Sequence, residues 1–516
     1  DYTLPPRTLI TSSPHPVSTS KTVLHSLLSP LSPESTLFPD GLINSKWIEK
    51  HQELVPCAFV LFYKFTSDPS LSKEYDIQLK KTISDERKCL SQSGYKCYLV
   101  FALISDNSMV ISPEIEERLS SIRREAGLDS KTCLLFLSSQ NSVAELEGSI
   151  SNLISKIYPA CIEYYRDLSK HSRRKKNRGV IPRPTAPLTS GTSQTLSSNS
   201  WNVRYDFKLG VFAEFRQEME TALRSYESSY ETLLGTDVLE AISNWSPRWN
   251  EARCLSDVLA FRMIRCHLWN GNYTTSVRRW MSHKERIKDF IDRRGRGSAT
   301  YGWAAWKARW ATVMAETISK ASIPEFDQSV IFLPVEKTIS TGTRIKPFEY
   351  LHHPGYWYRA ASNHLIVRRD LAFQIPEESR SPPNFSAGPR NAGPDYIYDT
   401  YMCPEPYEEY PLPGHQGVDH ASLILDSLTK AIVEFERRKQ IRFAQELQLF
   451  SAHELMKKRC WCEALGVLTS LWKRMTYRKE GWWNAAQEVL WALRKAALYV
   501  GDASLVITAD WELMNN

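Results

Sequence analysis

The sequence has no continuous apolar segment of the roughly 18 to 20 residues that a membrane-spanning helix requires. It begins at Asp1, and no charged and then apolar stretch of the secretory type follows. The ten cysteines are spread from Cys57 to Cys462, and Cys57, Cys97 and Cys133 lie inside apolar runs, where thiols act as small hydrophobic groups. We therefore expect a cytoplasmic protein in a reducing compartment, with at most a peripheral contact to membranes.

A strong charge of one sign is also missing. The 65 basic and 58 acidic residues leave a net charge of +7, which is mild for 516 residues. Nucleic-acid-binding proteins show a larger basic excess, gathered on one face. We therefore expect no nucleic acid among the partners.

The motifs of common enzyme classes are absent. The sequence contains no P-loop, no HExxH, no Gly-x-Ser-x-Gly elbow and no kinase signature set. The segment 62–69 after the first predicted strand has no glycine, so a backbone cradle for phosphate is not expected there. We predict that the protein is not an enzyme and that it needs no cofactor or metal.

Two pairs of residues are of metal-binding types. Cys460 and Cys462 have no second Cys/His pair nearby, whereas zinc sites usually show two such pairs. His352 and His353 stand before Pro354, with no partner that would make either histidine catalytic. We interpret both pairs as structural.

Three short apolar runs, at 55–63, 97–104 and 132–137, predict strands that are buried on both faces. Amphipathic segments separate them, and a long helix is predicted at about 142–168. Strands that alternate with helices imply right-handed crossovers and a parallel sheet. We predict a Rossmann-like α/β domain at 37–168, preceded by an extended arm at 1–36.

Residues 169–200 are predicted to be a basic and Ser/Pro-rich linker. The basic run comprises Arg173, Arg174, Lys175 and Lys176. We interpret this run as a solvated segment. Binding to anionic lipid and a nuclear localisation signal are the alternatives.

A spacing of bulky, small, apolar and bulky residues recurs after residue 201. It occurs at Met219–Ala222–Leu223–Tyr226, at Tyr273–Ser276–Val277–Trp280 and at Trp461–Ala464–Leu465–Leu468. In tetratricopeptide units such a small residue lets two antiparallel helices approach closely. The copies have no fixed period, so we predict an irregular α-solenoid of tetratricopeptide-like helix pairs at 201–516, with a Pro/Gly-rich loop at 374–418. Further helices are predicted at 251–269, 301–322, 356–370, 421–459 and 481–500.

Tryptophans mark two places in the predicted solenoid. Trp303, Trp306 and Trp310 follow helical spacing, which is typical of a core, although an exposed version would be a patch for a partner. Trp482 and Trp483 stand together at a predicted helix start. Our candidate partner-binding residues are Trp303, Trp306, Trp482 and Trp483.

Four segments together resemble the foie gras domain family, the family of subunit 11 of the trafficking protein particle (TRAPP) complex. They are Gly41–His51 leading into Leu54-Val-Pro56, Phe207–Gln217 followed by Ala222 and Tyr226, Pro354–Ala361, and Glu480–Trp483. The segments are short, but they occur in order across nearly the whole chain. Because members of this family continue into further β-rich segments, the resemblance also implies that this chain is a fragment.

The resemblance implies a non-catalytic scaffold in a vesicle-tethering assembly. Other TRAPP subunits would be its direct partners, a Rab-type GTPase would be served through the complex, and the Golgi membrane would be contacted peripherally. Endoplasmic reticulum-to-Golgi and intra-Golgi transport, with a contribution to autophagy, are the implied processes.

Two other hypotheses remain at this stage. One is a peripheral membrane adaptor that uses the basic linker on anionic lipid. The other is an enzyme with a pocket at the carboxyl ends of the strands, where Asp68 and Asp106 are the carboxylates to consider.

Overall fold

The structure is a computed structural model. It describes residues 25–38, 41–66, 72–105, 113–128, 134–137, 142–182, 196–242, 247–293, 298–321, 353–374, 418–477 and 480–515, with the single positions 323, 336, 344 and 349. This part is mostly helical, with one small parallel sheet near the N-terminus. It divides into two compact units, Asp1–Cys266 and His267–Asn516, whereas the sequence placed the domain boundary near residue 200. None of the described helices is both long enough and apolar enough to cross a bilayer.

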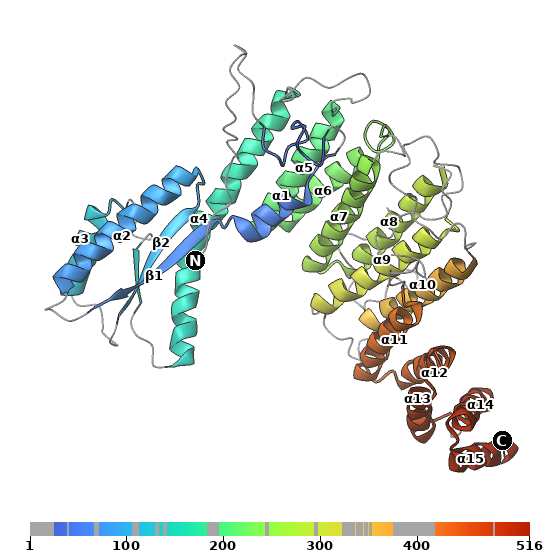
Figure 1. The fold of residues 1–516 in the computed structure, drawn as a ribbon. Helices are drawn as coiled ribbons and strands as arrows, with labels where there is room; N and C mark the ends of the chain where they lie inside the picture. Colours follow the sequence, from blue (N-terminus) through green and yellow to red (C-terminus); the bar gives the residue numbers. More distant parts are fainter. Residues whose placement is uncertain are drawn as a thin grey trace. The chain divides into compact units, whose positions relative to one another are not determined.

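The sheet of the first unit has three strands, β1 (Ala58–Phe65), β2 (Tyr98–Ser105) and β3 (Leu134–Leu137). They lie in the order β1-β2-β3, and both neighbouring pairs are parallel, as predicted. Helices α2 (Ser72–Ser93) and α3 (Pro113–Glu125) pack on one face, and the first half of α4 (Val143–Arg178) packs on the other (Figure 1). The predicted parallel sheet near the N-terminus is therefore confirmed.

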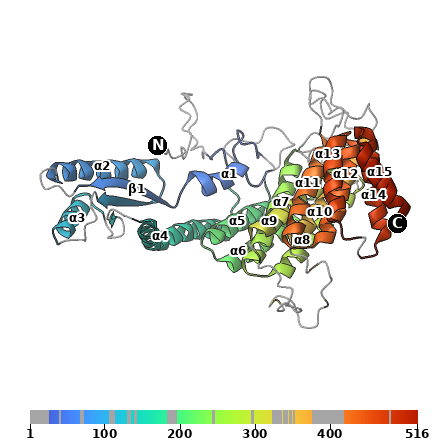
Figure 2. The same cartoon turned by 90° about the horizontal axis from the view of Figure 1, so that it is seen from below.

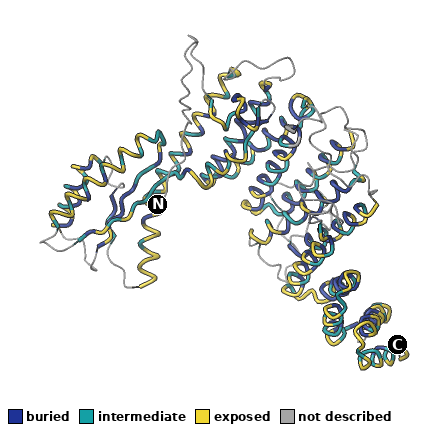
Figure 3. The backbone as a smooth tube through the Cα atoms, in the orientation of Figure 1, coloured by how far each residue is buried: buried dark blue, intermediate teal, exposed yellow. Residues whose placement is uncertain are grey.

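Helix α4 is longer than predicted. It begins after Ser142, whose side chain accepts a hydrogen bond from the backbone N–H of Glu145, and it ends at Gly179 in the left-handed region. The basic run therefore lies on a helix, and the prediction that a linker begins at residue 169 is corrected. Lysine and arginine form helices well, and cations are favoured in the last turn. Much of the first half of α4 is exposed (Figure 3).

The second half of α4 packs against α5 (Ser198–Phe215), and α5 packs against α6 (Met219–Leu233). From α4, Tyr165, Ser169 and Ser172 are buried at one-turn intervals. A short α1 (Ser45–Glu49) and a π-helical turn η1 (Lys50–Leu54) place Trp47 against Phe207 and Phe212 of α5. This is why the helices after residue 198 belong to the same unit as the sheet.

Helices α5 and α6 approach each other closely at Gly210. A Cβ atom at this position would lie 2.4 Å from the ring of the buried Tyr226. We expect Gly210→Ala to lower the free energy of unfolding by about 1 to 3 kcal/mol, because the ring has no space to retreat. Gly148→Ala on α4 is the matched control, because a Cβ atom there would meet nothing within 4 Å, and alanine should stabilise the helix by up to about 1 kcal/mol. Urea unfolding measures the change in the free energy of unfolding, which should be negative for Gly210→Ala and positive for Gly148→Ala. A stabilised Gly210→Ala variant would contradict the close approach of α5 and α6.

The chain enters the second unit within α7 (Pro247–Trp269). The remaining helices are α8 (Tyr273–Arg293), α9 (Tyr301–Lys320), α10 (Pro354–Gln374), α11 (His420–Arg437), α12 (Ile441–Lys457), α13 (Trp461–Arg474), α14 (Trp483–Val500) and α15 (Ala503–Asn515). From α9 onward each of these helices packs on the next (Figure 2). The segment 421–459, predicted as one helix, is divided at Lys439 into α11 and α12, and α15 was not predicted.

A recurring turn leads into six of the helices. A residue with positive φ is followed by one residue whose N–H bonds back to the carbonyl five positions earlier, which is the Schellman geometry. The donors and acceptors are Glu218 to Ala213, Asn272 to His267, Gln440 to Phe435, Cys460 to Leu455, Trp482 to Tyr477, and Asp502 to Ala497. The residues with positive φ are Gln217, Gly271, Lys439, Arg459, Gly481 and Gly501. Five of these turns join two helices directly, whereas the turn before α14 lies in a longer connection from Arg474 to Trp483.

The recurrent spacing seen in the sequence marks the helix starts that follow these turns. Met219, Tyr273 and Trp461 are the first residues of α6, α8 and α13. The small residues Ala222, Ser276 and Ala464 are fully buried. The pattern therefore identified buried positions that are filled by a small side chain.

Candidate interaction surfaces

Two of the four predicted partner-binding tryptophans lie in the core. Trp303 and Trp306 on α9 are each only 3% exposed, and their rings stack with centroids 4.7 Å apart. Trp310 continues the stack one turn further, 5.8 Å from Trp306. The contact role proposed for Trp303 and Trp306 is therefore corrected, because neither ring is accessible to a partner.

The same stack connects α9 to α8. The indole N–H of Trp280 donates to the carbonyl of Trp310 at 3.0 Å, and the indole N–H of Trp310 donates to the carbonyl of Trp280 at 3.3 Å. The two rings are nearly parallel, with centroids 6.2 Å apart. These tryptophans satisfy their polar groups within the core, which is what buried indoles usually require.

The other two predicted residues lie at the surface. Trp482 and Trp483, at the start of α14, are each 48% exposed. One face of Trp482 is covered by Tyr477, and the guanidinium of Arg442 lies 4.9 Å from its ring centroid. These contacts hold Trp482 in place while part of the ring remains open to a partner.

More apolar side chains are exposed along the last two helices. Ile507, Trp511 and Met514 on α15 are 69%, 66% and 76% exposed, at a spacing that places them on one helix face. Trp491 on α14 is exposed as well. We call Trp482, Trp483, Trp491, Ile507, Trp511 and Met514 the C-terminal apolar surface. Sequence reasoning missed the α15 part, although the spacing of four and then three residues was visible.

Some of the residues considered for a catalytic or metal site are described, and others are not. Asp68 and Asp106, which follow the first two strands, lie outside the described residues, as do His352 and most of the 374–418 loop. Within the described ranges, no group of three or more His, Cys, Asp or Glu residues is arranged to hold a metal. Cys460 and Cys462 lie at the start of α13. Burial, together with the nearby Arg438, lowers the pKa of His353 to about 4, and this histidine packs edge-on against Phe435.

The basic run on α4 lies at the contact with α5 and α6. Arg173, Arg174 and Lys175 are exposed, whereas Lys176 reaches Asp206 of α5 at 2.6 Å. Asp206 also accepts a hydrogen bond from the hydroxyl of Ser228 on α6. The basic run is therefore helical, and one of its four cations, Lys176, forms an ion pair between α4 and α5.

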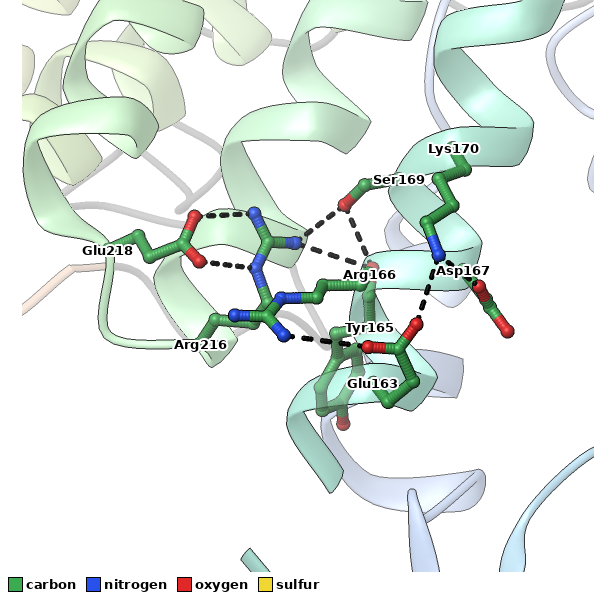
Figure 4. Close-up of polar contacts among 8 residues, drawn as sticks. All are labelled: Glu163, Tyr165, Arg166, Asp167, Ser169, Lys170, Arg216 and Glu218. Atoms are coloured by element: carbon green, nitrogen blue, oxygen red, sulfur yellow. Dashed lines mark hydrogen bonds and ion pairs between the residues drawn. The ribbon is translucent and has the colours of Figure 1, made fainter. Parts of the chain in front are cut away.

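One flank of α4 is balanced in charge. Arg216, at the end of α5, donates two hydrogen bonds to the carboxylate of Glu218 and one to the hydroxyl of Ser169 on α4 (Figure 4). Lys170 lies 3.0 Å from both Glu163 and Asp167. We call this side, with Glu163, Arg166, Asp167, Lys170, Arg216 and Glu218, the ion-paired flank.

The other flank is crowded with cations. His171, Lys175 and Arg178 share it at one-turn spacing, and the charges of Arg204 and Lys208 of α5 act on the pKa values of these residues. Lys50 of η1 acts on the pKa of Lys208. The buried Arg204 donates to the carbonyls of Leu42 and Leu28, at 2.5 and 3.2 Å. We call His171, Lys175, Arg178, Arg204, Lys208 and Lys50 the cationic flank.

The cationic flank affects the pKa values of its own groups. Burial, with Arg204, Lys175 and Lys50 nearby, lowers the pKa of Lys208 well below its usual value. Burial also lowers the pKa of Arg204 to about 10, and burial with Lys50 and Lys208 nearby lowers that of His51 to about 4. All of these shifts disfavour the protonated forms, as expected where cations are crowded at a partly buried site.

These features define a class of protein in which a small parallel-sheet domain is followed by sequentially packed helices that expose apolar and basic surfaces. Residues 248–516 match the Foie gras liver health family 1, and residues 1–146 match the trafficking protein particle complex subunit 11 N-terminal domain. The chain belongs to the foie gras family, which confirms the resemblance seen in the sequence.

Three curated relatives are similar along most of this chain. They are the trafficking protein particle complex subunit 11 proteins of Bos taurus, Gallus gallus and Homo sapiens, each 20% identical over 495 residues. The aligned region covers 92% of this chain but 39% of each relative. The chain therefore spans about two fifths of the length of the curated relatives that it matches.

Proposed function

We propose that this protein is a non-catalytic scaffold subunit of a TRAPP vesicle-tethering complex. The observation that carries the proposal is the exposed C-terminal apolar surface, on helices that match a family whose curated relatives are named as TRAPP subunits. Exposed tryptophans and large aliphatic side chains are common in protein contact sites. Other TRAPP subunits are the partners that we propose for it.

The helices after residue 201 act in this proposal as an irregular α-solenoid of tetratricopeptide-like pairs. Supporting this, consecutive helices from α9 to α15 pack on one another, and tight turns precede six of the helices. In solenoids each repeat contacts its neighbours, which leaves long surfaces free for partners. Through the complex, the protein supports activation of a Rab-type GTPase in endoplasmic reticulum-to-Golgi and intra-Golgi transport, and in autophagy. It acts in the cytoplasm and peripherally at the Golgi.

A retention experiment tests the contact surface. The tagged chain is co-expressed with TRAPP subunits and recovered with either Trp482→Ala/Trp483→Ala or the control Trp269→Ala. Trp269 is also exposed, at 63%, but lies on α7. Loss of a central aromatic contact weakens binding by about 2 kcal/mol or more, or about 30-fold. We expect the double variant to lose the bound subunits and the control to keep them.

The melting temperature of each variant is measured in parallel. We expect little change for either variant, because these rings are largely outside the core. Full retention by the double variant would contradict the proposed surface. Retention lost together with folding would place the two rings in the core instead, which also contradicts it.

A further inference from the structure

Helix α13 carries an open groove of about 570 Å³ on the face opposite to its buried residues Ala464, Leu468 and Leu471. Four of the residues that line the groove recur every three or four positions and therefore share one helix face: Cys462, Gly466, Thr469 and Lys473. They form a floor that is about 16 Å long at 1.5 Å per residue.

The walls of the groove are apolar. They come from Leu465 of α13, from Val500 at the end of α14 and from Leu505 near the start of α15. On α15, Leu505 lies on a different side from Ile507 and Trp511, because residues two or six positions apart do not share a helix face. The groove is therefore separate from the C-terminal apolar surface.

Two contacts fix the helices that border the groove. The rings of Trp461 and Tyr499 stack with centroids 3.9 Å apart, which joins the start of α13 to the end of α14. The indole N–H of Trp472 donates to both carboxylate oxygens of Glu512, each at 3.1 Å, which joins the last turn of α13 to the last turn of α15. Helices α13 and α15 therefore run in the same direction along the groove.

The packing of the chain does not explain Gly466 in the floor. Glycine is a poor helix former, yet it stands here inside α13. A Cβ atom at this position would meet nothing within 4 Å, whereas one at Gly210 would meet the ring of Tyr226. No neighbouring element needs the missing side chain of Gly466. A glycine in such a place lets a ligand approach the backbone closely.

The charge in the groove indicates the chemistry of that ligand. Lys473 is exposed, is the one charged residue of the lining, and forms no ion pair with any residue that the structure describes. It lies about 10 Å from Gly466 along the helix. A carboxylate is favoured beside Lys473, and an aliphatic side chain is favoured beside Gly466, where the apolar walls begin.

The open shape favours a peptide over a small molecule. Sites for small molecules cover most of the surface of their ligand, and a groove open to solvent does not. An extended chain of the polyproline II type advances about 9 Å in three residues and returns to the same side. Two side chains three positions apart therefore match the distance between Gly466 and Lys473.

We propose that this groove binds an extended acidic peptide of a partner protein. An aliphatic side chain of the peptide lies over Gly466, and a carboxylate three residues away pairs with Lys473. The site goes beyond the scaffold role, because it recognises a short segment by its sequence and lies apart from the C-terminal apolar surface.

Fluorescence anisotropy of labelled peptides with the intact chain tests the site. Each peptide contains one leucine and one glutamate in a serine background, with zero to four serines between them and in both orders. We expect the tightest binding when two serines separate them. Replacing the glutamate by lysine should weaken binding about fivefold, because an attraction to Lys473 is lost and a repulsion is gained.

The variant Gly466→Ala separates ligand binding from folding, because the two effects have opposite signs. It should raise the melting temperature by up to about 4 °C, since alanine is the better helix former. It should weaken binding of the two-serine peptide at least about fivefold, since the added methyl group occupies the floor. Lys473→Gln should weaken binding about two- to fivefold and abolish the preference for glutamate over lysine.

The matched controls should leave peptide binding unchanged. They are Gly148→Ala on α4, where a Cβ atom also meets nothing within 4 Å, and Lys495→Gln at an exposed position of α14. Failure of all peptides to bind, equal binding to the parent and Gly466→Ala, or equal binding of the glutamate and lysine peptides would overturn the proposal. Binding that appears only after the 374–418 loop is shortened, or only where the chain is monomeric, would mark this chain or a second copy as the occupant and overturn the assignment to a partner.

Discussion

Replacing Glu214 by alanine is expected to lower the free energy of unfolding of the first unit by about 3 to 5 kcal/mol. The carboxylate of Glu214 accepts hydrogen bonds from Arg262 at 2.7 Å and from the hydroxyl of Tyr226 at 2.6 Å, and it pairs with Arg265 at 2.9 Å. The side chain of Arg262 is only 5% exposed. Without Glu214 its charge would remain buried with no carboxylate to balance it.

Hydrogen exchange of the amides in α5, α6 and α7 measures this loss locally, because these helices contribute Glu214, Tyr226 and the two arginines. Glu220→Ala is the matched control on α6. Its ion pair with Arg224 is 4.0 Å long and highly exposed, and such pairs are worth at most about 1 kcal/mol. If Glu214→Ala lowered the free energy of unfolding no more than Glu220→Ala does, the buried network around Glu214 would not stabilise the packing of these helices.

The sheet and the helix starts were predictable because their signals are local. A buried strand needs an apolar run, and a close helix contact needs a small residue such as Ala222 or Ala464 at a fixed distance from a helix start. The turn residues Gly271, Gly481 and Gly501 were visible too, since glycine favours positive φ. Lys439 was not, because lysine has no preference for a left-handed backbone. This explains the single helix predicted over 421–459.

The length of α4 and the charge balance of its flanks depend on residues far away in the sequence. Lys176 meets Asp206, and Ser169 meets Arg216, across the contact between α4 and α5. From the sequence alone, Arg173–Lys176 has the same composition whether it is a solvated linker or a helix face. The distinction between an ion-paired and a cationic flank therefore appears only in the fold.

For the tryptophans too, spacing in the sequence does not show which rings are buried. Helical spacing describes both Trp306 and Trp483, yet the first is buried and the second is half exposed. What separates them is the rest of each helix. Residues 301–306 at the start of α9 are all buried, although its later turns carry the exposed Arg309 and Glu316. The first two residues of α14 are exposed, although both helices contain charged residues.

Truncating Trp306 should therefore act on stability and not on a partner contact. The ring lies between Trp303 and Trp310, at centroid distances of 4.7 and 5.8 Å, with His283 at 5.9 Å. Removing a buried indole leaves a cavity with fixed walls, and Trp306→Ala should lower the free energy of unfolding of the second unit by about 3 to 5 kcal/mol. Hydrogen exchange in α8, α9 and α10 measures the loss.

The matched control is Trp491→Ala on α14, whose ring is 57% exposed. Its truncation should change the stability of the same unit by less than about 1 kcal/mol, because little of the ring is withdrawn from water. If Trp306→Ala were as mild as Trp491→Ala, the stack would not form in solution, and the ring would be available to a partner after all. A large loss for Trp306→Ala and a small one for Trp491→Ala would instead assign the α9 tryptophans to the core and leave partner contact to the C-terminal apolar surface.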